Sequence, residues 1–290
     1  MIPYNGNIIV IAGPTSSGKS KIALKLAQDI NGVIVNADSK QVYKELLIGT
    51  ARPTEGEIKI VPHYLYGHTS VKEGYNIFKY QKDIEEILKN LKSPQVPILV
   101  GGTGLYIDSI VFNYKLKEAD IDPVENEKLN NMTIEELQKI VGERNLKKLN
   151  ESDRQNRMRL IRVIQRGNTQ IKRGKKLNHL YLVLDIPQEV LNQNIEKRVE
   201  QMFEDGLVEE NLYLRKNKLY DYLSLRTIGY QEFNSYFEAK KSIEEVKKDI
   251  ILHTKQYAKR QRTWFRRNKD AIWCKNYEEV LENSLKFINN

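Results

Sequence analysis

The chain has 290 residues, with 47 Lys and Arg against 38 Asp and Glu, a net charge of +9 and a pI near 9.3. A chain of this length can bury one or two hydrophobic cores. Its single cysteine, Cys274, excludes an internal disulfide framework and is consistent with a reducing compartment. No apolar stretch reaches membrane-spanning length and no signal-peptide pattern is visible, so we expect a cytoplasmic protein without a membrane partner.

A short apolar run at 8–12 (IIVIA) predicts a buried strand, and residues 21–27 predict the start of a helix. Between them lies the pattern G-x-x-x-x-G-K-[ST]. In this context the pattern forms a phosphate-binding loop, because its backbone N–H groups and the helix N-terminus surround a phosphate. Lys19 would supply a mobile positive charge and Ser20 a hydroxyl for Mg²⁺. The predicted loop consists of Gly13, Pro14, Thr15, Ser16, Ser17, Gly18, Lys19 and Ser20.

Three more apolar runs, at 33–36, 97–100 and 180–184, are typical of strands in a parallel sheet buried on both faces. Helices separate the first three runs, among them one over 76–91. Asp38 follows the second run near the phosphate loop, where three roles are open to it: metal ligand through water, general base, or N-cap of the next helix. We favour chemistry over capping. A glycine turn at 101–104 follows the third run and is weak evidence for a ligand site.

Residues 115–177 are polar and hold no strand-like run, and we predict two helices there, near 133–149 and 152–166. We interpret this segment as an α-helical insertion domain between core segments 1–114 and 178–290. The predicted fold class is α/β: a P-loop NTPase-like parallel sheet flanked by helices, with a helical C-terminal part. That part ends in a long helix from 242 to about 267, which Ser242 and Glu245 start with a capping box.

Basic residues recur at helical spacing on two of these elements, so each set shares one helix face. Basic faces with interleaved aromatic residues are typical of proteins that bind RNA loops, although a solvated face explains either set alone. Two such faces on separate elements favour a large anionic ligand. The sets are Lys255, Lys259, Arg262 and Arg266 on the last helix, and Arg159, Arg162 and Arg166 in the insertion.

The four histidines, His63, His68, His179 and His253, are scattered along the chain. They offer neither zinc-ligand spacing nor a nucleophile–base pair. We therefore do not expect metallohydrolase or catalytic-triad chemistry.

Nearly the whole chain resembles the bacterial tRNA dimethylallyltransferase family, in motifs that keep their order from end to end. The motifs are 13–20, 38–43 (DSKQVY), 48–54 (IGTARPT), 101–106 (GGTGLY), the spacing Asp153, Asn156, Arg159, Arg162, then Arg198-Val199 with Met202 and 206–207, 228–230 (IGY), and 257–261 (YAKRQ) with Trp264. The chain departs from the family at Gln165, where a glutamate is usual, and at 64–67 (YLYG), which replaces His-Leu-Ile-Asp.

The resemblance implies an enzyme that transfers a dimethylallyl group from dimethylallyl diphosphate to N6 of the adenosine immediately 3′ of the anticodon. It implies Mg²⁺ as cofactor and the tRNA anticodon stem-loop as partner. We also expect a monomer, although the sequence does not determine the oligomeric state. By the same resemblance Asp38 is the general base, and Thr15 and Arg198 act on the diphosphate held by the phosphate loop. The tRNA-binding residues that it implies are Asp38, Ser39, Lys40, Gln41, Asn156, Arg157, Arg159, Arg162, Arg226, Gln231, Lys255, Gln256, Lys259, Arg260 and Arg262.

Three alternatives remain open. One is a small-molecule kinase that uses ATP on the same loop, with Asp38 as base toward a hydroxyl. The basic helices argue against it, because a metabolite kinase needs neither. The others are a regulatory P-loop module that binds nucleotide and RNA without chemistry, and a prenyltransferase of free adenine nucleotides.

Overall fold

The structure, a computed structural model, describes residues 2–116, 123–166 and 172–289. They form two compact units. One combines Met1–Asn113 with Gly174–Asn290, and the other is Tyr114–Arg173. These boundaries lie one and four residues N-terminal to the boundaries expected from the sequence.

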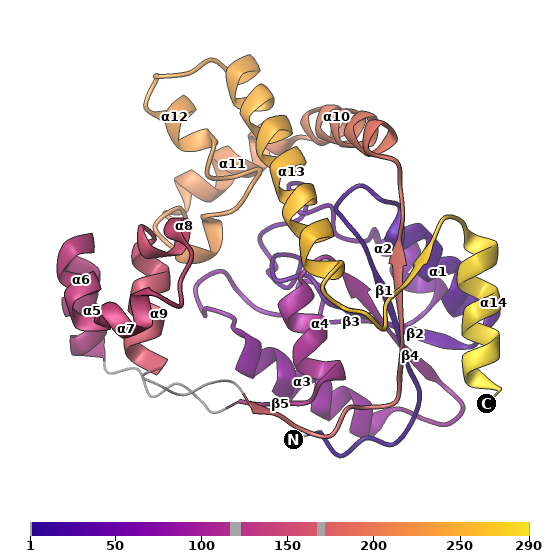
Figure 1. The fold of residues 1–290 in the computed structure, drawn as a ribbon. Helices are drawn as coiled ribbons and strands as arrows, with labels where there is room; N and C mark the ends of the chain where they lie inside the picture. The colour runs from indigo at the N-terminus through magenta and orange to yellow at the C-terminus, as the bar shows by residue number, and fades with distance from the viewer. Residues whose placement is uncertain (1, 117–122, 167–171, 290) are drawn as a thin grey trace. The chain divides into compact units, whose positions relative to one another are not determined.

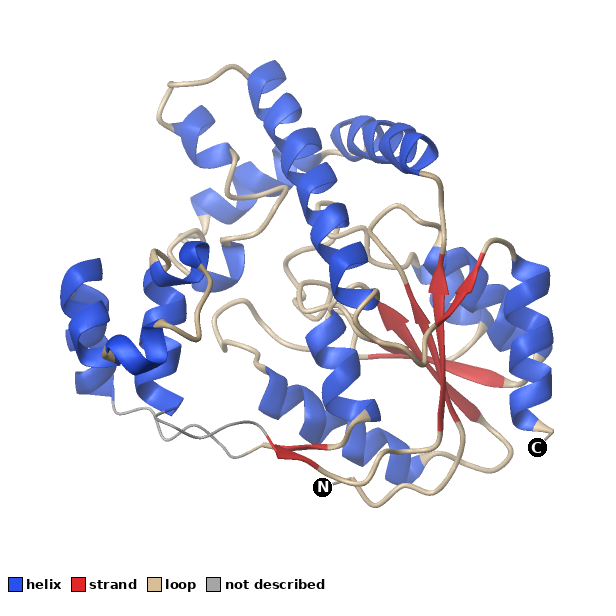
Figure 2. Ribbon diagram, in the orientation of Figure 1, coloured by secondary structure: helices blue, strands red, loops and turns tan. Residues whose placement is uncertain are grey.

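A parallel sheet of six strands lies at the centre of the first unit, in the order β3-β2-β4-β1-β7-β8 (Figure 2). The four inner strands coincide with the predicted apolar runs and confirm the α/β fold class. They are β1 (Ile8–Ala12), β2 (Gly32–Asn36), β4 (Val96–Gly101) and β7 (His179–Leu184). The edge strands β3 (His63–Tyr64) and β8 (Ile272–Cys274) were not predicted, because two or three residues carry no readable pattern.

Helices α1 (Lys19–Asp29) and α14 (Tyr277–Ile288) cover one face of the sheet, and α3 (Ile77–Asn90) and α4 (Gly104–Val111) cover the other (Figure 1). A short helix, α2 (Glu55–Ile60), precedes β3. The first face packs Leu26 of α1 and Val280 of α14 against Ile9 and Ile11 of β1. The predicted helix over 76–91 is α3, which Asn76 caps.

A helical layer completes this unit after β7. Its members are α10 (Gln188–Glu204), α11 (Leu207–Lys216), the 3₁₀ turn η1 (Leu223–Leu225), α12 (Phe233–Phe237) and α13 (Ile243–Phe265). Helix α13 is the long helix predicted from the sequence, and Ser242 and Glu245 form its capping box. The prediction that the chain ends with this helix is wrong, because β8 returns to the sheet edge and α14 follows, capped by Asn276.

The second unit begins and ends in an antiparallel ribbon of β5 (Tyr114–Lys115) and β6 (Lys172–Arg173). The two helices predicted here are four shorter ones, because Gly142 at φ 74° ends the first and Asn150 caps a new helix. A fifth helix, α5, was not predicted. The helices are α5 (Pro123–Asn131), α6 (Ile134–Val141), α7 (Glu143–Leu146), α8 (Glu151–Arg154) and α9 (Arg157–Arg166). Leu137 and Leu160 lie in the hydrophobic core of the second unit.

Candidate active site

The phosphate loop connects β1 to α1 at the carboxyl end of the sheet. Gly18, the N-cap of α1, has a left-handed φ of 83°, and Ser16 has a φ of 61°. Within the described chain, Ser16 Oγ and Ser17 Oγ are buried and have no hydrogen-bond partner. Buried hydroxyls are normally paired, and an anion with several acceptor oxygens would pair both. The loop therefore has the chemistry of a phosphate site.

Lys19 lies inside this loop, where its Nζ donates to the carbonyl oxygen of Pro14 at 3.3 Å. Burial and the nearby charge of Arg198 lower the pKa of Lys19 to about 8, although Asp38 acts in the opposite direction. An anionic ligand would raise this pKa again, because it favours the charged ammonium. Lys19 and Arg198 thus place two positive charges around a position suited to a negative one.

Arg198, on α10, connects the phosphate loop to the loop that contains Thr50. Its Nη1 donates to Thr15 Oγ1 at 2.9 Å, and its Nη2 donates to the carbonyl oxygen of Thr50 at 3.2 Å. Burial lowers the pKa of Arg198, and Asp38 opposes that shift. Since the Thr15 hydroxyl accepts from Arg198, its own proton can point toward a ligand on the loop.

Asp38 follows β2 and faces the same region. Its Oδ1 accepts from the backbone N–H of Lys40 at 2.8 Å and of Gln41 at 3.4 Å. It therefore caps a turn rather than the next helix, which begins only at Glu55. The turn fixes the carboxylate, and Oδ2 remains available to a ligand. A capping role and a chemical role are compatible at this residue.

A cavity of about 380 Å³ opens beside Asp38, Thr15 and Arg198. This volume falls within the usual range of small-ligand pockets. Val199, Met202, Ile228, Ile250 and Tyr257 give it an apolar side, and its polar lining includes Ser39, Lys40, Arg226, Gln231 and Arg260. The cavity thus combines an apolar wall, a fixed carboxylate and a basic rim.

Helix α13 contacts the phosphate loop through Gln261, which is 4% exposed. Gln261 Oε1 accepts from Thr15 N at 2.8 Å, and Gln261 Nε2 donates to Gly102 O at 2.9 Å. A Cβ on Gly102 would lie 2.0 Å from Gln261 Nε2, and one on Gly104 would lie 2.1 Å from Trp264 Cδ1. The glycine turn at 101–104 therefore allows α13 to approach the phosphate loop. Sequence analysis did not assign Gln261 a role, although a polar residue in line with the buried Ala258 and Phe265 is the signal that could have found it.

Glu210 of α11 holds the loop that presents Thr50. Its carboxylate accepts from three consecutive N–H groups, those of Leu47, Ile48 and Gly49, and from the hydroxyl of Tyr230. No sequence pattern pointed to this residue. It positions the Thr50 carbonyl that orients Arg198.

The basic residues expected on α13 differ in their surroundings. Lys255 pairs with Glu196 at 2.5 Å, and Arg262 pairs with Asp185 at 3.2 Å, so both tie α13 to neighbouring elements. Gln256, Lys259 and Arg260 are exposed. Gln41, also expected to bind tRNA, donates to the carbonyl oxygens of Thr50 and Ala51.

The candidates in the second unit lie on or next to α9. Arg157 donates to the backbone carbonyl oxygens of Asn130 and Met132, which holds α9 to the end of α5. The Asn156 side chain accepts from Arg159 N, and Arg159 pairs with Asp153 at 3.4 Å. Arg162 is exposed. The side chain of Arg166 lies outside the described residues.

In the described parts of the chain, no three His, Cys, Asp or Glu side chains gather as metal ligands. A helix long and apolar enough to cross a membrane is likewise absent from residues 2–116, 123–166 and 172–289.

The family model of IPP transferase matches residues 41–268, which is more than half of the chain. The chain belongs to this family. The resemblance found in the sequence is thereby confirmed. Among IPP transferase relatives, the tRNA dimethylallyltransferase of Trichormus variabilis is 39% identical over 281 residues, covering 92% of this chain and 93% of the relative. That of Crocosphaera subtropica is 36% identical over 275 residues, covering 92% and 91%.

Solved structures agree with this assignment. The tRNA isopentenylpyrophosphate transferase of Bacillus halodurans superposes with a TM-score of 0.75 at 27% identity, covering 98% of this chain and 96% of that one. A eukaryotic dimethylallyltransferase that acts on tRNA shares the fold, with a TM-score of 0.76 at 24% identity, covering 97% and 77%. The relatives do not favour the kinase or the free-nucleotide alternative.

Proposed function

We propose that the protein transfers the dimethylallyl group of dimethylallyl diphosphate to N6 of the adenosine immediately 3′ of the tRNA anticodon, giving N6-isopentenyladenosine and diphosphate. The observation that carries the proposal is the juxtaposition, around one cavity, of a phosphate loop, a fixed carboxylate and an apolar wall. The relatives named tRNA dimethylallyltransferase support it.

The phosphate loop suits the leaving group. As the bond between C1 of the dimethylallyl group and the diphosphate oxygen breaks, negative charge develops on that oxygen. The Thr15 hydroxyl, Lys19 and Arg198 converge on this position, and Arg198 already contacts Thr15 at 2.9 Å. Preorganised donors stabilise such charge without reorganising during the reaction. Diphosphate stabilisation is therefore the main electrostatic task of the loop.

Asp38 can act as the general base toward the nucleophile. The exocyclic N6 amine is a weak nucleophile, because its lone pair is delocalised into the adenine ring. As N6 bonds to C1, one N6 proton passes to Asp38, whose carboxylate lines the cavity. The target base must leave its stack to reach this carboxylate. Tyr257 and Met202 on the cavity wall offer surfaces for the flipped base and the dimethylallyl group.

Mg²⁺ fits the loop as the expected cofactor. Ser20, in the first turn of α1, offers the hydroxyl oxygen that hard cations prefer, and its side chain is exposed. When bound, the ion would neutralise charge on the departing diphosphate.

The direct test is to incubate the protein with dimethylallyl diphosphate, Mg²⁺ and either unmodified tRNA or AMP, then digest the RNA and detect prenylated adenosine by mass spectrometry. We expect N6-isopentenyladenosine at the position 3′ of the anticodon and none on AMP. Product on AMP alone would identify a nucleotide prenyltransferase, and no product with either acceptor would refute the proposal.

A further inference from the structure

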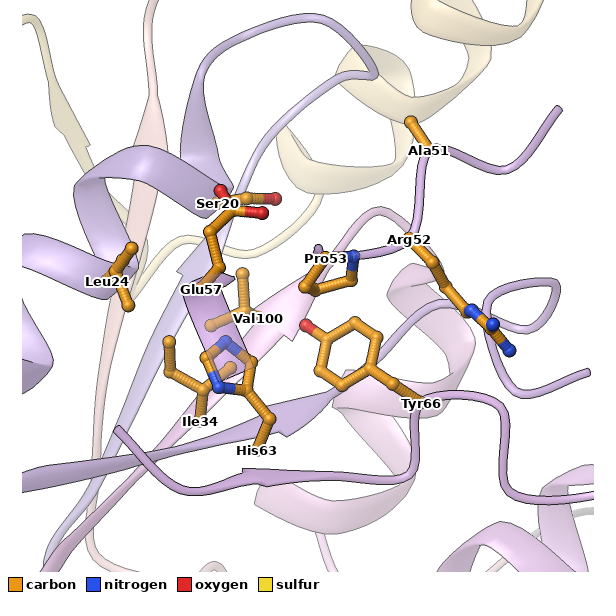
Figure 3. A pocket seen from close by; sticks show the side chains of 10 residues that line it. All are labelled: Ser20, Leu24, Ile34, Ala51, Arg52, Pro53, Glu57, His63, Tyr66 and Val100. Atoms are coloured by element: carbon orange, nitrogen blue, oxygen red, sulfur yellow. The ribbon is translucent and has the colours of Figure 1, made fainter. Parts of the chain in front are cut away.

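A second, smaller pocket of about 70 Å³ lies on the Ser20 side of the phosphate loop (Figure 3). Its apolar walls come from Leu24 of α1, Ile34 of β2 and Val100 of β4. Its polar lining includes Ser20, Glu57 and His63. The two pockets share no lining residue, although Asp38, which lines the larger one, lies close enough to help raise the pKa of Tyr66 in the smaller one. Of its lining residues, only Ser20 has a role in catalysis as proposed above.

The pocket holds acceptor atoms on Glu57 and His63, beside the Tyr66 hydroxyl, which can donate or accept. His63 Nδ1 lies 2.8 Å from the carbonyl oxygen of Val61, and a carbonyl only accepts, so Nδ1 carries the proton. Burial lowers the pKa of His63, which favours the neutral ring with a lone pair on Nε2. The capping contacts of Glu57 to Thr54 use Oε2, so Oε1 can accept from the pocket. Arg52 also lines the pocket, but its Nη1 donates to the backbone of Tyr43 and Lys44, and its guanidinium is drawn pointing away (Figure 3).

Strand β4 provides no carboxylate at the corresponding end, and Asp38, which follows β2, lines the larger cavity instead. P-loop NTPases hold Mg²⁺ with the loop Ser or Thr and an Asp from the sheet. Here β4, the neighbour of β1 on this side, ends in Val100-Gly101. Glu57 is the carboxylate that lines a pocket together with Ser20. Mg²⁺ dehydrates reluctantly and keeps several waters, which donate hydrogen bonds outward.

We propose that Glu57 and His63 form the outer-sphere part of a Mg²⁺ site at Ser20, where they accept hydrogen bonds from the waters of the ion that accompanies the diphosphate. This inference rests on the proposed function, which places diphosphate on the loop. It agrees with the absence of three gathered acidic or imidazole ligands in the described chain, because outer-sphere residues need not touch the ion. Glu57 and His63 are positioning residues in this scheme.

Binding of inorganic pyrophosphate by the full-length protein, measured by calorimetry over a series of Mg²⁺ concentrations, tests the proposal without turnover. Glu57→Gln removes the charge, while the capping box accepts Gln as well as Glu, so α2 stays capped. Glu55→Gln, an exposed change on the same helix, is the matched control. We expect Glu57→Gln and His63→Ala each to raise the half-saturating Mg²⁺ concentration about 10-fold or more, as outer-sphere changes do. Saturating Mg²⁺ should restore pyrophosphate affinity.

A spectroscopic readout separates this role from a structural one. Mn²⁺ replaces Mg²⁺, and its paramagnetic signal reports the free ion in the presence of protein and pyrophosphate. Glu57→Gln should leave more Mn²⁺ free than Glu55→Gln does. Equal metal dependence in the two variants, or a loss of pyrophosphate affinity that saturating metal does not restore, would overturn the inference. Failure of the unmodified protein to bind pyrophosphate with metal would instead refute the proposed function.

Discussion

Glu210→Gln tests the role of the loop that orients Arg198. In the structure Glu210 Oε2 accepts from Leu47 N at 3.0 Å and Ile48 N at 2.9 Å, and Oε1 accepts from Gly49 N at 3.2 Å and Tyr230 Oη at 2.7 Å. A glutamine keeps one acceptor oxygen and turns an N–H₂ group toward the other two donors.

The expected loss of stability depends on where those donors lie. The amide nitrogen should take the place of Oε2 and face Leu47 and Ile48, because this orientation costs the least stability. The contact at Leu47 is exposed, so its N–H can donate to water instead. The Ile48 contact is partly buried and loses a charge-assisted hydrogen bond. Such a bond contributes about 1.5–3 kcal/mol, so we expect the free energy of unfolding to fall by about the same amount.

Urea unfolding followed by circular dichroism measures the loss of stability, and single-turnover kinetics measure its effect on the site. Because the loop carries Thr50, whose carbonyl accepts from Arg198, the transfer rate at saturating donor should also fall. Glu209→Gln on the same helix is exposed and serves as control. If Glu210→Gln matched Glu209→Gln in both measurements, the loop would not position Arg198 as argued.

Three further predictions concern the base, the RNA and the loop lysine. Asp38→Asn should lower the single-turnover rate by about 10²–10⁴-fold while tRNA and pyrophosphate binding persist, and a near-normal rate would exclude Asp38 as base. Removing the charges of Lys259 and Arg260 should reduce the slope of log affinity for tRNA against log salt concentration by about 0.7–0.9 per contact. Lys255→Ala should change this slope less, because Lys255 already pairs with Glu196. Equal slopes in all variants would indicate that this face of α13 is only solvated. The pKa of Lys19, about 8 instead of 10.5, means that the free protein loses this proton as pH rises through about 8 and that an anion restores it. Calorimetry at pH 8.5 in buffers of different ionisation enthalpy should therefore show more proton uptake on pyrophosphate binding in the unmodified protein than in Lys19→Met, and equal uptake would contradict the assigned pKa.

The phosphate loop could be predicted from the sequence because its geometry is local. Gly13 and Gly18 permit the turn, and strand β1 and helix α1 adjoin it in the chain. The four inner strands were also predictable, since each is a continuous apolar run buried on both faces. The edge strands were not, because β3 and β8 are too short for their periodicity to show.

The remainder of the site depends on contacts between distant residues. Arg198 meets Thr15 across 183 positions, and Gln261 meets Thr15 across 246. The family resemblance indicated Arg198, but no local pattern distinguishes it from other helix arginines. Gln261 and Glu210 act on backbone groups, which look alike at every position in a sequence, so their roles appear only in three dimensions.

The position of β1 in the sheet affects how the protein is made. β1 pairs with β4 on one side and with β7 on the other, yet the unit Tyr114–Arg173 lies between those partners in the chain. From the end of β4 at Gly101 to the start of β7 at His179 there are 78 residues to synthesise. At about 5–20 residues per second, the apolar β1 strand has one unpaired edge for roughly 4–16 s on the ribosome. An unpaired apolar edge invites association with other chains. Changes that delay the insertion should therefore lower the yield of soluble protein before they lower the activity of the molecules that fold.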